Sequence, residues 1–556
     1  MTHRTCVVLL VAVVSLAPAP LRAQDPAPAP PSPALILQSI QINGVTLYLD
    51  DEIARRAGLE QVGQGIGRSA EEIAEAVRQV YREDGFTLAT VNATLDETTG
   101  RLTISVDEGR FDDIRLTGLD EGVAPPILER LALRTGEVFN VSQANRALDD
   151  ALTITEGAVQ RAEPTFQIVA DAGRRVLQIA LRQRSQRGGA FAGTQGREDW
   201  YSPVDALSFA IGAQGTIFDR GRFTNTHWSG YVSRKFGPDR FGYSFGIERA
   251  LLPQSMLQIG GSIQDITATD DDWRLGDAEQ SLVALLFRNT FRDYYRRKGF
   301  QVHAALTPAE AHELVVAWRD ESHGSLANET NYGVFRDSHV FRANRAADPG
   351  DLRALVLGYT FDSRGAAGGA PEDRYRRHLL DSLFGDEVER EPGFRVEWRS
   401  EIAPGAFGHD FDFARHVVQA RGWWTPSSGR GIGARVIAGG SSGTLPAQRV
   451  FALGGIGSVH GYRFKEQAGD GMVLLNGEFR QQLGGSEFAG LVFLDVGRVY
   501  GATPPGPQDP AYEPGAWMRG VGVGLEFDGG ARVEFGWRLN EIPGSLQVLF
   551  RLRPSF

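Results

Sequence analysis

The last eleven residues, 546–556, alternate apolar and polar side chains and end on an aromatic residue. One face carries the apolar set Leu546, Val548, Phe550, Leu552, Pro554 and Phe556. The other face carries Gln547, Arg551, Arg553 and Ser555, with Leu549 as the one apolar exception. Because successive side chains of a strand point to opposite faces, the pattern predicts a strand with one apolar face and one face exposed to water. A barrel strand in a lipid bilayer needs this pattern, and a half-buried strand of a soluble sandwich is the alternative.

The same alternation recurs from about Gly188 to the last residue, in short runs separated by loops rich in Gly, Asp, Pro and Arg. The runs predicted as strands are 206–215, 225–233, 242–248, 256–263, 282–288, 301–306, 352–361, 393–402, 411–424, 431–438, 472–482, 490–500, 520–527, 531–539 and 546–556. A further strand is expected within 313–338. The predicted fold class is a transmembrane antiparallel β-barrel of about sixteen strands. It is expected to be closed, because hydrocarbon does not tolerate an unpaired strand edge.

Two segments of about 75 residues precede the barrel and share one order of elements. The first has a strand at 36–42, a short helix at 51–59, a helix starting at Ser69, and strands at 87–95 and 101–106. Ser69 and Glu72 have the spacing of a capping box. The second has a strand at 113–116, helices at 125–133 and from about Ser142, and strands at 162–169 and 175–181. A β-α-α-β-β unit that occurs twice is an internal repeat.

The first 34 residues predict export. Arg4, the apolar stretch 7–17 and a small residue at Ala23 are typical of a signal peptide over 1–23, and 24–34 is a Pro/Ala linker. The single cysteine, Cys6, lies in the leader, so the mature chain is expected to hold no disulfide and no cysteine-ligated metal. No later run of eighteen apolar residues predicts a helical membrane span. The net charge of −11, with no basic stripe, argues against nucleic acid as a partner.

The stretch from Tyr81-Arg-Glu-Asp-Gly-Phe86 to Ile104-Ser-Val-Asp-Glu-Gly109 resembles polypeptide-transport-associated (POTRA) domains. These domains stand in the periplasm before barrels of the outer membrane protein 85 superfamily. The second copy resembles them by its order of elements and by the segment 113–118. The resemblance implies an outer-membrane protein of a Gram-negative-type bacterium with its POTRA domains in the periplasm. The implied domains are signal peptide 1–23, linker 24–34, POTRA 1 35–110, POTRA 2 111–186 and barrel 187–556.

Two further motifs resemble signatures of the same superfamily. The long connection 441–471 contains Leu453-Gly-Gly-Ile-Gly-Ser-Val-His-Gly-Tyr-Arg-Phe464, which is similar to a Val-Arg-Gly-Tyr type tip on a loop folded into the lumen. A later strand contains Phe493-Leu-Asp-Val-Gly497, similar to a Phe-x-Asp-x-Gly run. In such barrels the loop arginine contacts the aspartate and tethers the loop to the wall. The residues implied for tip and wall are Val459, His460, Gly461, Tyr462, Arg463, Phe493, Asp495 and Gly497, and Asn476, Glu478 and Arg480 on the strand after the loop also resemble the family.

The alternation itself gives Asp495 an inward direction. Phe493, Asp495 and Gly497 share one face, and an aspartate is not expected to face lipid. Gly497 would leave space for a closely approaching loop.

His460 departs from the family pattern, because it stands where the family has arginine. Arginine is always charged and offers a planar fork of donors, whereas histidine has no fork and titrates near neutral pH. Either His460 packs against Asp495 as a weaker tether, which is the hypothesis preferred here, or Arg463 takes that place. The alternative is that both are ordinary solvated lumen residues.

No catalytic residue, cofactor or metal is predicted. Gly439-Gly-Ser-Ser-Gly443 fits the G-x-S-x-G pattern of hydrolases, but no helix follows it, so the required strand–turn–helix context is missing. His409, Asp410, Asp412 and His416 are metal-ligand types whose alternation favours a lumen or loop edge over a metal cluster. The segment 270–272, three aspartates, favours a solvated loop over a site for cations that bridge lipopolysaccharide.

The resemblance implies that the protein translocates or inserts polypeptides. POTRA domains would capture unfolded clients by β-augmentation and pass them to the barrel, through its lumen or at a seam between first and last strands. Two POTRA domains and the chain length are most similar to two-partner secretion transporters, which carry a plug helix where this chain has the linker. The alternatives are an assembly factor for other barrel proteins and a passive porin-type channel. Expected partners are unfolded or partly folded clients, outer-membrane lipid and lipopolysaccharide, and periplasmic chaperones.

Overall fold

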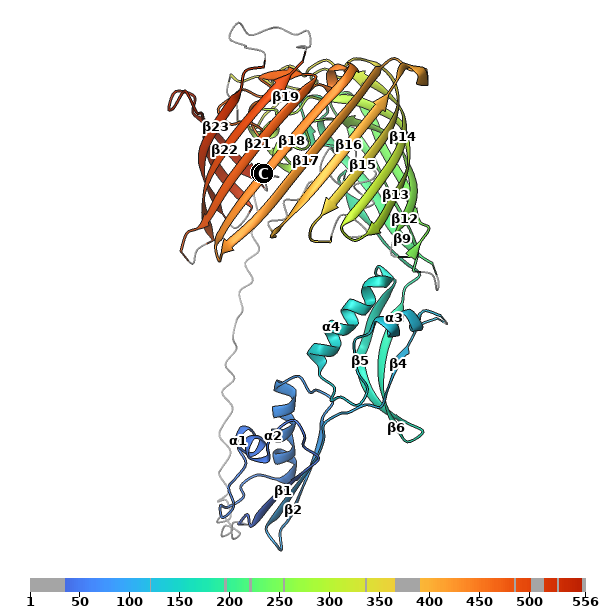
Figure 1. The fold of residues 1–556 in the computed structure, drawn as a ribbon, viewed down its shortest axis with the longest axis vertical. Helices are drawn as coiled ribbons and strands as arrows, with labels where there is room; N and C mark the ends of the chain where they lie inside the picture. Colours follow the sequence, from blue (N-terminus) through green and yellow to red (C-terminus); the bar gives the residue numbers. More distant parts are fainter. Residues whose placement is uncertain are drawn as a thin grey trace, which may run out of the picture. The chain divides into compact units, whose positions relative to one another are not determined.

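The computed structural model describes residues 36–552 except 121, 195–197, 220–222, 254–255, 336–337, 366–390, 485–486, 502–514 and 528–529 (Figure 1). The predicted signal peptide 1–23, the linker 24–34 and the last residues Arg553 to Phe556 lie outside the described residues. Within the described part, no helix is both long enough and apolar enough to cross a bilayer.

The first N-terminal domain has the predicted order of elements. These are β1 (Ser39–Asn43), α1 (Asp50–Arg56), α2 (Ala70–Glu83), β2 (Thr90–Asp96) and β3 (Arg101–Asp107). β3 is the central strand, parallel to β1 and antiparallel to β2. Ile73 and Val77 of α2 lie on the face that is buried in the domain core. The predicted capping box is present, because Ser69 and Glu72 each bond the other's backbone nitrogen.

The second N-terminal domain repeats this order. Its elements are β4 (Asp113–Thr117), α3 (Ala124–Arg130), α4 (Val141–Leu152), the single turn η1 (Thr153–Thr155), β5 (Val159–Asp171) and β6 (Arg174–Gln183). The sheet order β4-β6-β5 matches the order β1-β3-β2 of the first domain, with the last strand in the middle. The predicted internal repeat is therefore present at the level of topology. The predicted domain boundaries stay predictions.

The C-terminal part is a closed barrel of antiparallel strands (Figure 1). Its strands are β7 (Gln186–Ala192), β8 (Tyr201–Ser202), β9 (Ala206–Phe218), β10 (Asn225–Lys235), β11 (Arg240–Ala250), β12 (Leu257–Ala268), β13 (Tyr295–Ala309), β14 (His312–Ser325), β15 (Gly350–Asp362), β16 (Gly393–Ala403), β17 (Asp412–Ser427), β18 (Arg430–Thr444), β21 (Gly471–Gln482), β22 (Phe488–Tyr500), β23 (Met518–Phe527), β24 (Ala531–Arg538) and β25 (Gln547–Leu552). Because β7 and β8 both pair with β9, the described strands occupy sixteen positions around the wall. This confirms the predicted fold class.

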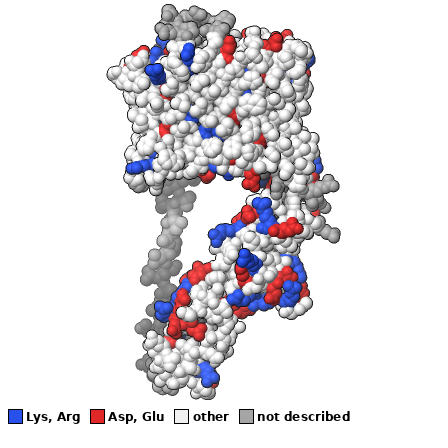
Figure 2. Space-filling view, viewed as in Figure 1, with Lys and Arg blue, Asp and Glu red and all other residues white. Residues whose placement is uncertain are grey.

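The wall alternates between an apolar exterior and a polar interior. On β25, Val548 and Phe550 are each 56% exposed, while Arg551, which follows Phe550, is fully buried. Leu549 is also buried, packed with Leu275 and Ile456. Figure 2 shows the same contrast, since few charged side chains lie on the barrel wall and many lie on the N-terminal domains. An apolar exterior of this kind is what a barrel needs in hydrocarbon.

One predicted strand is wrong. Of the residues 282–288, all but the last belong to a helix, α5 (Asp277–Phe287), which follows β12, and Arg288 is its C-cap. Asp277 and Glu279 lie in its first turn, where acidic side chains favour a helix start, and the segment from Gln280 to Leu286 contains three leucines, which are strong helix formers. A short apolar run cannot be assigned to strand or helix by periodicity alone. The first barrel strand, β7, was not among the predicted runs.

Candidate functional site

A hairpin loop, residues 445–470, joins β18 to β21. Its arms are β19 (Phe451–Leu453) and β20 (Gln467–Gly469), which pair antiparallel, and the short helix η4 (Ala447–Arg449) precedes them. The segment between the arms, 454–466, forms the tip. Val459 and Ser458 at the tip are 0% and 1% exposed, so the tip is enclosed by the barrel. We call residues 445–470 the lumen loop.

The tip of the lumen loop is bonded to β22 through His460 and Asp495. Nδ1 of His460 lies 2.6 Å from Oδ2 of Asp495, and the His460 backbone nitrogen donates to the same oxygen at 3.1 Å. The His460 ring also packs on Phe493, with centroids 4.4 Å apart. Asp495 is 2% exposed, while its neighbour Leu494 on the other face is 45% exposed. The carboxylate therefore points into the barrel and the leucine points out of it.

A second carboxylate faces the other side of the same ring. Nε2 of His460 lies 3.1 Å from Oε2 of Glu534 on β24. Carboxylates accept hydrogen bonds, and a neutral imidazole has only one N–H. Both contacts are satisfied when His460 carries two ring protons, so the arrangement selects the charged imidazolium. A charged histidine between two carboxylates gives a positive group at the place where the sequence resemblance implies an arginine.

Asn476 on β21 extends the network from Asp495 back to the loop. Its Nδ2 donates to Oδ1 of Asp495 at 2.6 Å and to the backbone oxygen of Ser458 at 2.8 Å. Its Oδ1 accepts from Nε and Nη2 of Arg435 at 3.0 and 2.8 Å, and Arg435 also donates to the Gly457 oxygen at 2.8 Å. Both oxygens of Asp495 are thus occupied, one by the loop and one by the wall.

Glycines on the wall give the tip the room it needs. A Cβ on Gly536 would lie 2.6 Å from Cβ of His460, and one on Gly520 would lie 2.7 Å from the His460 oxygen. A Cβ on Gly497 would lie 2.8 Å from Leu453 and 3.2 Å from Val459. Gly461 itself has φ of +82°, a conformation that side chains rarely adopt. A side chain at Gly520 or Gly536 would displace the loop, because it would meet the backbone oxygen or the Cβ of His460, whereas at Gly497 the end of the Leu453 side chain would have to move.

The rest of the tip is bonded to the last strands. The Gly461 nitrogen donates to Oε1 of Gln547 on β25 at 3.2 Å, and its oxygen accepts from Nε of Arg538 at 3.0 Å. The guanidinium of Arg538 stacks on the Tyr462 ring at 4.4 Å. Arg463 is exposed and is not among the described partners of Asp495, which are His460 and Asn476.

The base of the lumen loop is bonded to another part of the wall. Arg449 donates to Glu401 on β16 at 3.0 Å and to the Tyr295 hydroxyl on β13 at 2.6 Å. β13 and β24 are nine steps apart in the order around the wall, which has sixteen positions. The loop is therefore bonded to nearly opposite sides of the barrel.

The structure brings together most of the residues that the sequence analysis predicted for the loop tip and the barrel wall. Val459, His460, Gly461, Tyr462, Phe493, Asp495, Gly497 and Asn476 meet at the tip. Glu478 and Arg480 face inward but have other partners, Arg532 and Glu526. Phe550 is exposed on the outer face of β25, Leu552 is half-buried at its end, and Phe556 lies outside the described residues. The tether role of this set stays a prediction.

Sequence reasoning missed Glu534 and Arg435. Glu534 shares an inward face with Arg532 and Gly536, so the alternation of the run 531–539 could have indicated that Glu534 faces the lumen. The partner of a charged lumen residue, however, depends on strand order and register, which the alternation does not define. Among the described residues, no group of three His, Cys, Asp or Glu side chains is placed to hold a metal. Ser441, of the G-x-S-x-G pattern, lies within β18 and donates to the Asp470 oxygen.

Residues 391–551 match the family model described as the Omp85 superfamily domain. The barrel carries an Omp85 superfamily domain. The matched range contains the lumen loop, Asp495 and Glu534, so the resemblance drawn from those motifs is confirmed. An Omp85 barrel lies in the outer membrane, which agrees with the apolar exterior of this wall. No curated relative matches the chain in sequence.

Solved structures similar to this chain have low sequence identity. BamA from Haemophilus ducreyi lacking POTRA domains 1–3 is 14% identical with a TM-score of 0.44, over 93% of this chain and 98% of that chain. CdiB from Escherichia coli is 16% identical with a TM-score of 0.37, over 95% and 92%. CdiB from Acinetobacter baumannii is 14% identical with a TM-score of 0.35, over 94% and 89%.

Proposed function

We propose that this Omp85 protein moves polypeptides into or across the outer membrane and is most similar in action to a two-partner secretion transporter. The observation that carries the proposal is the lumen loop within an Omp85 domain, held by buried bonds to nearly opposite sides of the barrel. A passive porin-type channel needs an open bore and only short periplasmic turns. Two N-terminal domains and an occupied bore fit a protein that handles polypeptides better.

Clients would be captured by pairing with the edge of an N-terminal sheet. In the first domain β2 is an edge strand, and among the described strands it pairs only with β3. Thr90, Asn92, Thr94 and Asp96 are exposed along it. An extended client can add a strand to such an edge through backbone hydrogen bonds, which gives affinity with little sequence specificity.

An assembly factor for other barrel proteins is the second candidate, favoured by the seam of the barrel. The first strand, β7, has seven residues, whereas β17 has sixteen. Fewer ladder bonds can hold a short strand, so the seam beside β7 is the place where the wall would open sideways. A client strand could then enter the membrane there.

Depletion of the protein in its own cells separates these functions. For secretion, one exported protein disappears from the medium and accumulates in the periplasm, while other barrel proteins keep their levels. For assembly, several barrel proteins decrease together in the outer membrane. An unchanged exported and outer-membrane proteome, together with loss of small-solute uptake, would contradict both and favour the channel.

Capture on the edge strand is tested by photo-crosslinking in living cells. A photoreactive residue at Thr94 on β2 is expected to form adducts with clients. The matched control is Glu71 on α2, whose side chain is 86% exposed. Equal adducts at the two positions would contradict capture by strand pairing.

A further inference from the structure

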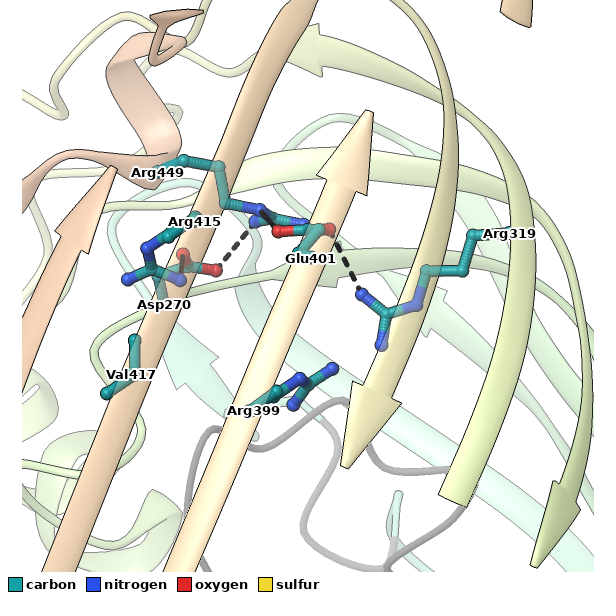
Figure 3. A pocket seen from close by; sticks show the side chains of 7 residues that line it. All are labelled: Asp270, Arg319, Arg399, Glu401, Arg415, Val417 and Arg449. Carbon is teal, nitrogen blue, oxygen red and sulfur yellow. Dashed lines mark hydrogen bonds and ion pairs between the residues drawn. The ribbon is translucent and has the colours of Figure 1, made fainter. Parts of the chain in front are cut away.

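Cationic side chains inside the barrel and on its outer face have different surroundings. In the lumen, guanidinium groups lie beside carboxylates, as Figure 3 shows for Glu401 between Arg319 and Arg449. The outer face of the wall meets lipid, where a cation is unfavourable at the bilayer midplane and tolerated near the two interfaces. A cation on the outer face therefore indicates a place where the wall meets polar groups of the membrane.

Lys298 lies on the outer face of the barrel wall, on strand β13. Phe300 and Val302, which share its face of the strand, are exposed, and Arg297 on the other face is buried. Lys298 itself is exposed. Its ammonium group is therefore directed away from the lumen and toward the membrane.

The direction of the strands shows which end of β13 carries Lys298. β7 directly follows the second N-terminal domain, which lies in the periplasm, so Gln186 is at the periplasmic end of that strand. From β7 through β9 to β13 each strand is antiparallel to the one before it. β13 consequently starts at the extracellular end with Tyr295, and Lys298 is three residues further along.

The apolar band of the wall begins directly below Lys298. From its extracellular end, the outer face of β13 carries in order Arg296, Lys298, Phe300, Val302, Ala304 and Leu306. Residues on one face of a strand follow each other at about 6.5 Å, so Lys298 is one such step beyond an aromatic side chain. Aromatic side chains mark the interfaces of a membrane barrel. This order places Lys298 at the level of the lipid head groups in the outer leaflet.

The carboxylates nearest to Lys298 are already bonded to arginines. Asp265, directly opposite on β12, accepts from Nε and Nη2 of Arg296 at 2.8 and 2.5 Å, one bond on each oxygen. Asp320 on β14 accepts from Nε of Arg353 at 3.0 Å. Among the described residues, neither carboxylate forms an ion pair with Lys298. Its ammonium group is thus available to a partner outside the chain.

Two further donors lie beside Lys298. Ser322 stands directly opposite on β14, and its exposed hydroxyl has no bond to a described residue. Arg296, one step along the same face, uses Nε and Nη2 for Asp265 and keeps both hydrogens of Nη1. Asp351 bounds the site on one side, since it lies across from Ser322 on β15, about 10 Å from Lys298 at the spacing of two strands.

The geometry points to a binding site for a lipid phosphate on the outer face of β13, formed by Lys298, Ser322 and Arg296. Two kinds of lipid can supply the phosphate: the lipid A part of lipopolysaccharide carries phosphate monoesters, and a phospholipid carries a diester. A monoester has three terminal oxygens and about 1.5 to 2 negative charges at neutral pH. An ammonium group, a hydroxyl and Nη1 of a guanidinium together match three oxygens, so the site is assigned to lipid A. The inference goes beyond the proposed function, because the lipid would bind whatever the barrel transports.

The test compares the full chain with its Lys298→Gln variant, both in neutral detergent. EDTA is present, so that divalent cations cannot bridge carboxylates to phosphate. Native mass spectrometry measures the affinity of each protein for diphosphorylated lipid A and for the same lipid A after removal of its phosphates. The variant is expected to bind diphosphorylated lipid A about tenfold more weakly than the unchanged protein, the value of one hydrogen bond to a charged group. Both proteins should bind the dephosphorylated lipid equally.

Phosphatidylglycerol, a phospholipid with a diester, separates the two sources of phosphate. Because each lipid is compared between two proteins, the different acyl chains cancel. Lys298→Gln is expected to weaken binding of phosphatidylglycerol less than it weakens binding of diphosphorylated lipid A. An equal or larger loss for phosphatidylglycerol would overturn the assignment to lipid A.

Further variants connect the effect to this site. Lys298→Arg keeps a cation and should keep most of the affinity, and Ser322→Ala should lower it about threefold, the value of one neutral hydrogen bond. The matched control is Arg249→Gln, which changes an exposed cation on the outer face near the periplasmic end of β11. Arg249 is bonded to Asp219 and Thr226, and its change should leave lipid A binding unaltered. Gel mobility of the unheated protein, which differs between folded and unfolded barrels, checks that each variant folds.

Two results would overturn the site. One is an affinity for diphosphorylated lipid A that is unchanged in folded Lys298→Gln, since the lysine would then be an ordinary exposed cation. The other is an equal loss in Arg249→Gln, since any cation on the outer face would then have the same effect. These measurements need neither a client nor a cell, so they are independent of the depletion experiment.

Discussion

One oxygen of Asp495, Oδ2, receives both the backbone nitrogen and the ring Nδ1 of His460, at 3.1 and 2.6 Å. The backbone bond fixes the position of the loop tip, and the ring bond adds charge. A histidine can therefore occupy this place without the planar fork of arginine, because Glu534 accepts from its second nitrogen. The contact of His460 with the wall combines one main-chain bond with two charged pairs.

Replacing His460 by alanine is expected to free the tip of the lumen loop. Asp495 and Glu534 would then be buried without the positive ring that they share, which would destabilise the docked loop by about 3 kcal/mol. A reporter cysteine at Ser458, in a Cys6→Ser background, would measure this by labelling with a membrane-impermeant maleimide, since Ser458 is 1% exposed.

The control for this variant is Arg463→Ala, because this side chain is exposed and is not among the described partners of Asp495. Labelling of the reporter should stay slow in this variant and rise in His460→Ala. Equal labelling in the two variants would contradict the tether.

A single methyl group on Gly536 is expected to displace the loop, since its Cβ would lie 2.6 Å from Cβ of His460. Gly536→Ala should raise labelling of the Ser458 reporter while the barrel keeps its unheated gel mobility. Gly477→Ala on β21 is the control, because the nearest atom to its Cβ would be 4.0 Å away. Slow labelling in Gly536→Ala would show that the tip can shift without leaving the wall.

Converting Asn476 to aspartate is expected to destabilise the network by about 2 kcal/mol. The change removes the donors to Asp495 and to the Ser458 oxygen and places two carboxylates side by side. Urea unfolding of the barrel in micelles, followed by tryptophan fluorescence, measures the loss. Gln481→Glu makes the same change at a solvent-accessible end of β21 and should have little effect; an equal loss in both would argue against the network.

Acid is expected to weaken the first N-terminal domain through Glu108. Burial alone would raise the pKa of Glu108, but hydrogen bonds from Thr46 and Leu47 outweigh it and lower the pKa below 4.5. A group whose pKa is lower in the folded state stabilises the fold above its unfolded value, and this contribution is lost as pH falls through the folded value. Pulse-labelling hydrogen exchange of α2 at increasing urea, after equilibration at pH about 7 and about 3, measures the difference. Glu108→Gln should reduce this pH dependence, and an unchanged pH dependence would contradict the assignment.

Local pattern predicted a large part of the fold. The helix from Ser69 and the strands of both N-terminal domains are visible in apolar spacing and in the capping box, which depend on neighbours in sequence. The inward direction of Asp495 follows from its alternation with Leu494. These features need no knowledge of which strands are adjacent in space.

Features that depend on long-range contacts were not predictable from such patterns. The helix α5 was read as a strand because its apolar run is short and its place over Arg551 of β25 is a tertiary relationship, with Glu279 accepting from Arg551 at 2.7 Å. Glu534 and Arg435 reach the loop tip only through the closed order of the wall. Which of His460 and Arg463 meets Asp495 depends on the turn of the tip around Gly461.

The base of the lumen loop is bonded to Tyr295 on one side of the wall, and its tip is bonded to Glu534 on nearly the opposite side. The lumen loop therefore obstructs the bore from one side to the other. Ion flow through the resting barrel should accordingly be small, and a polypeptide that crossed the bore, as proposed, would first have to break specific charged contacts. Its passage would then be limited by an activation step located at a few side chains, and its rate would be sensitive to single substitutions far from either opening.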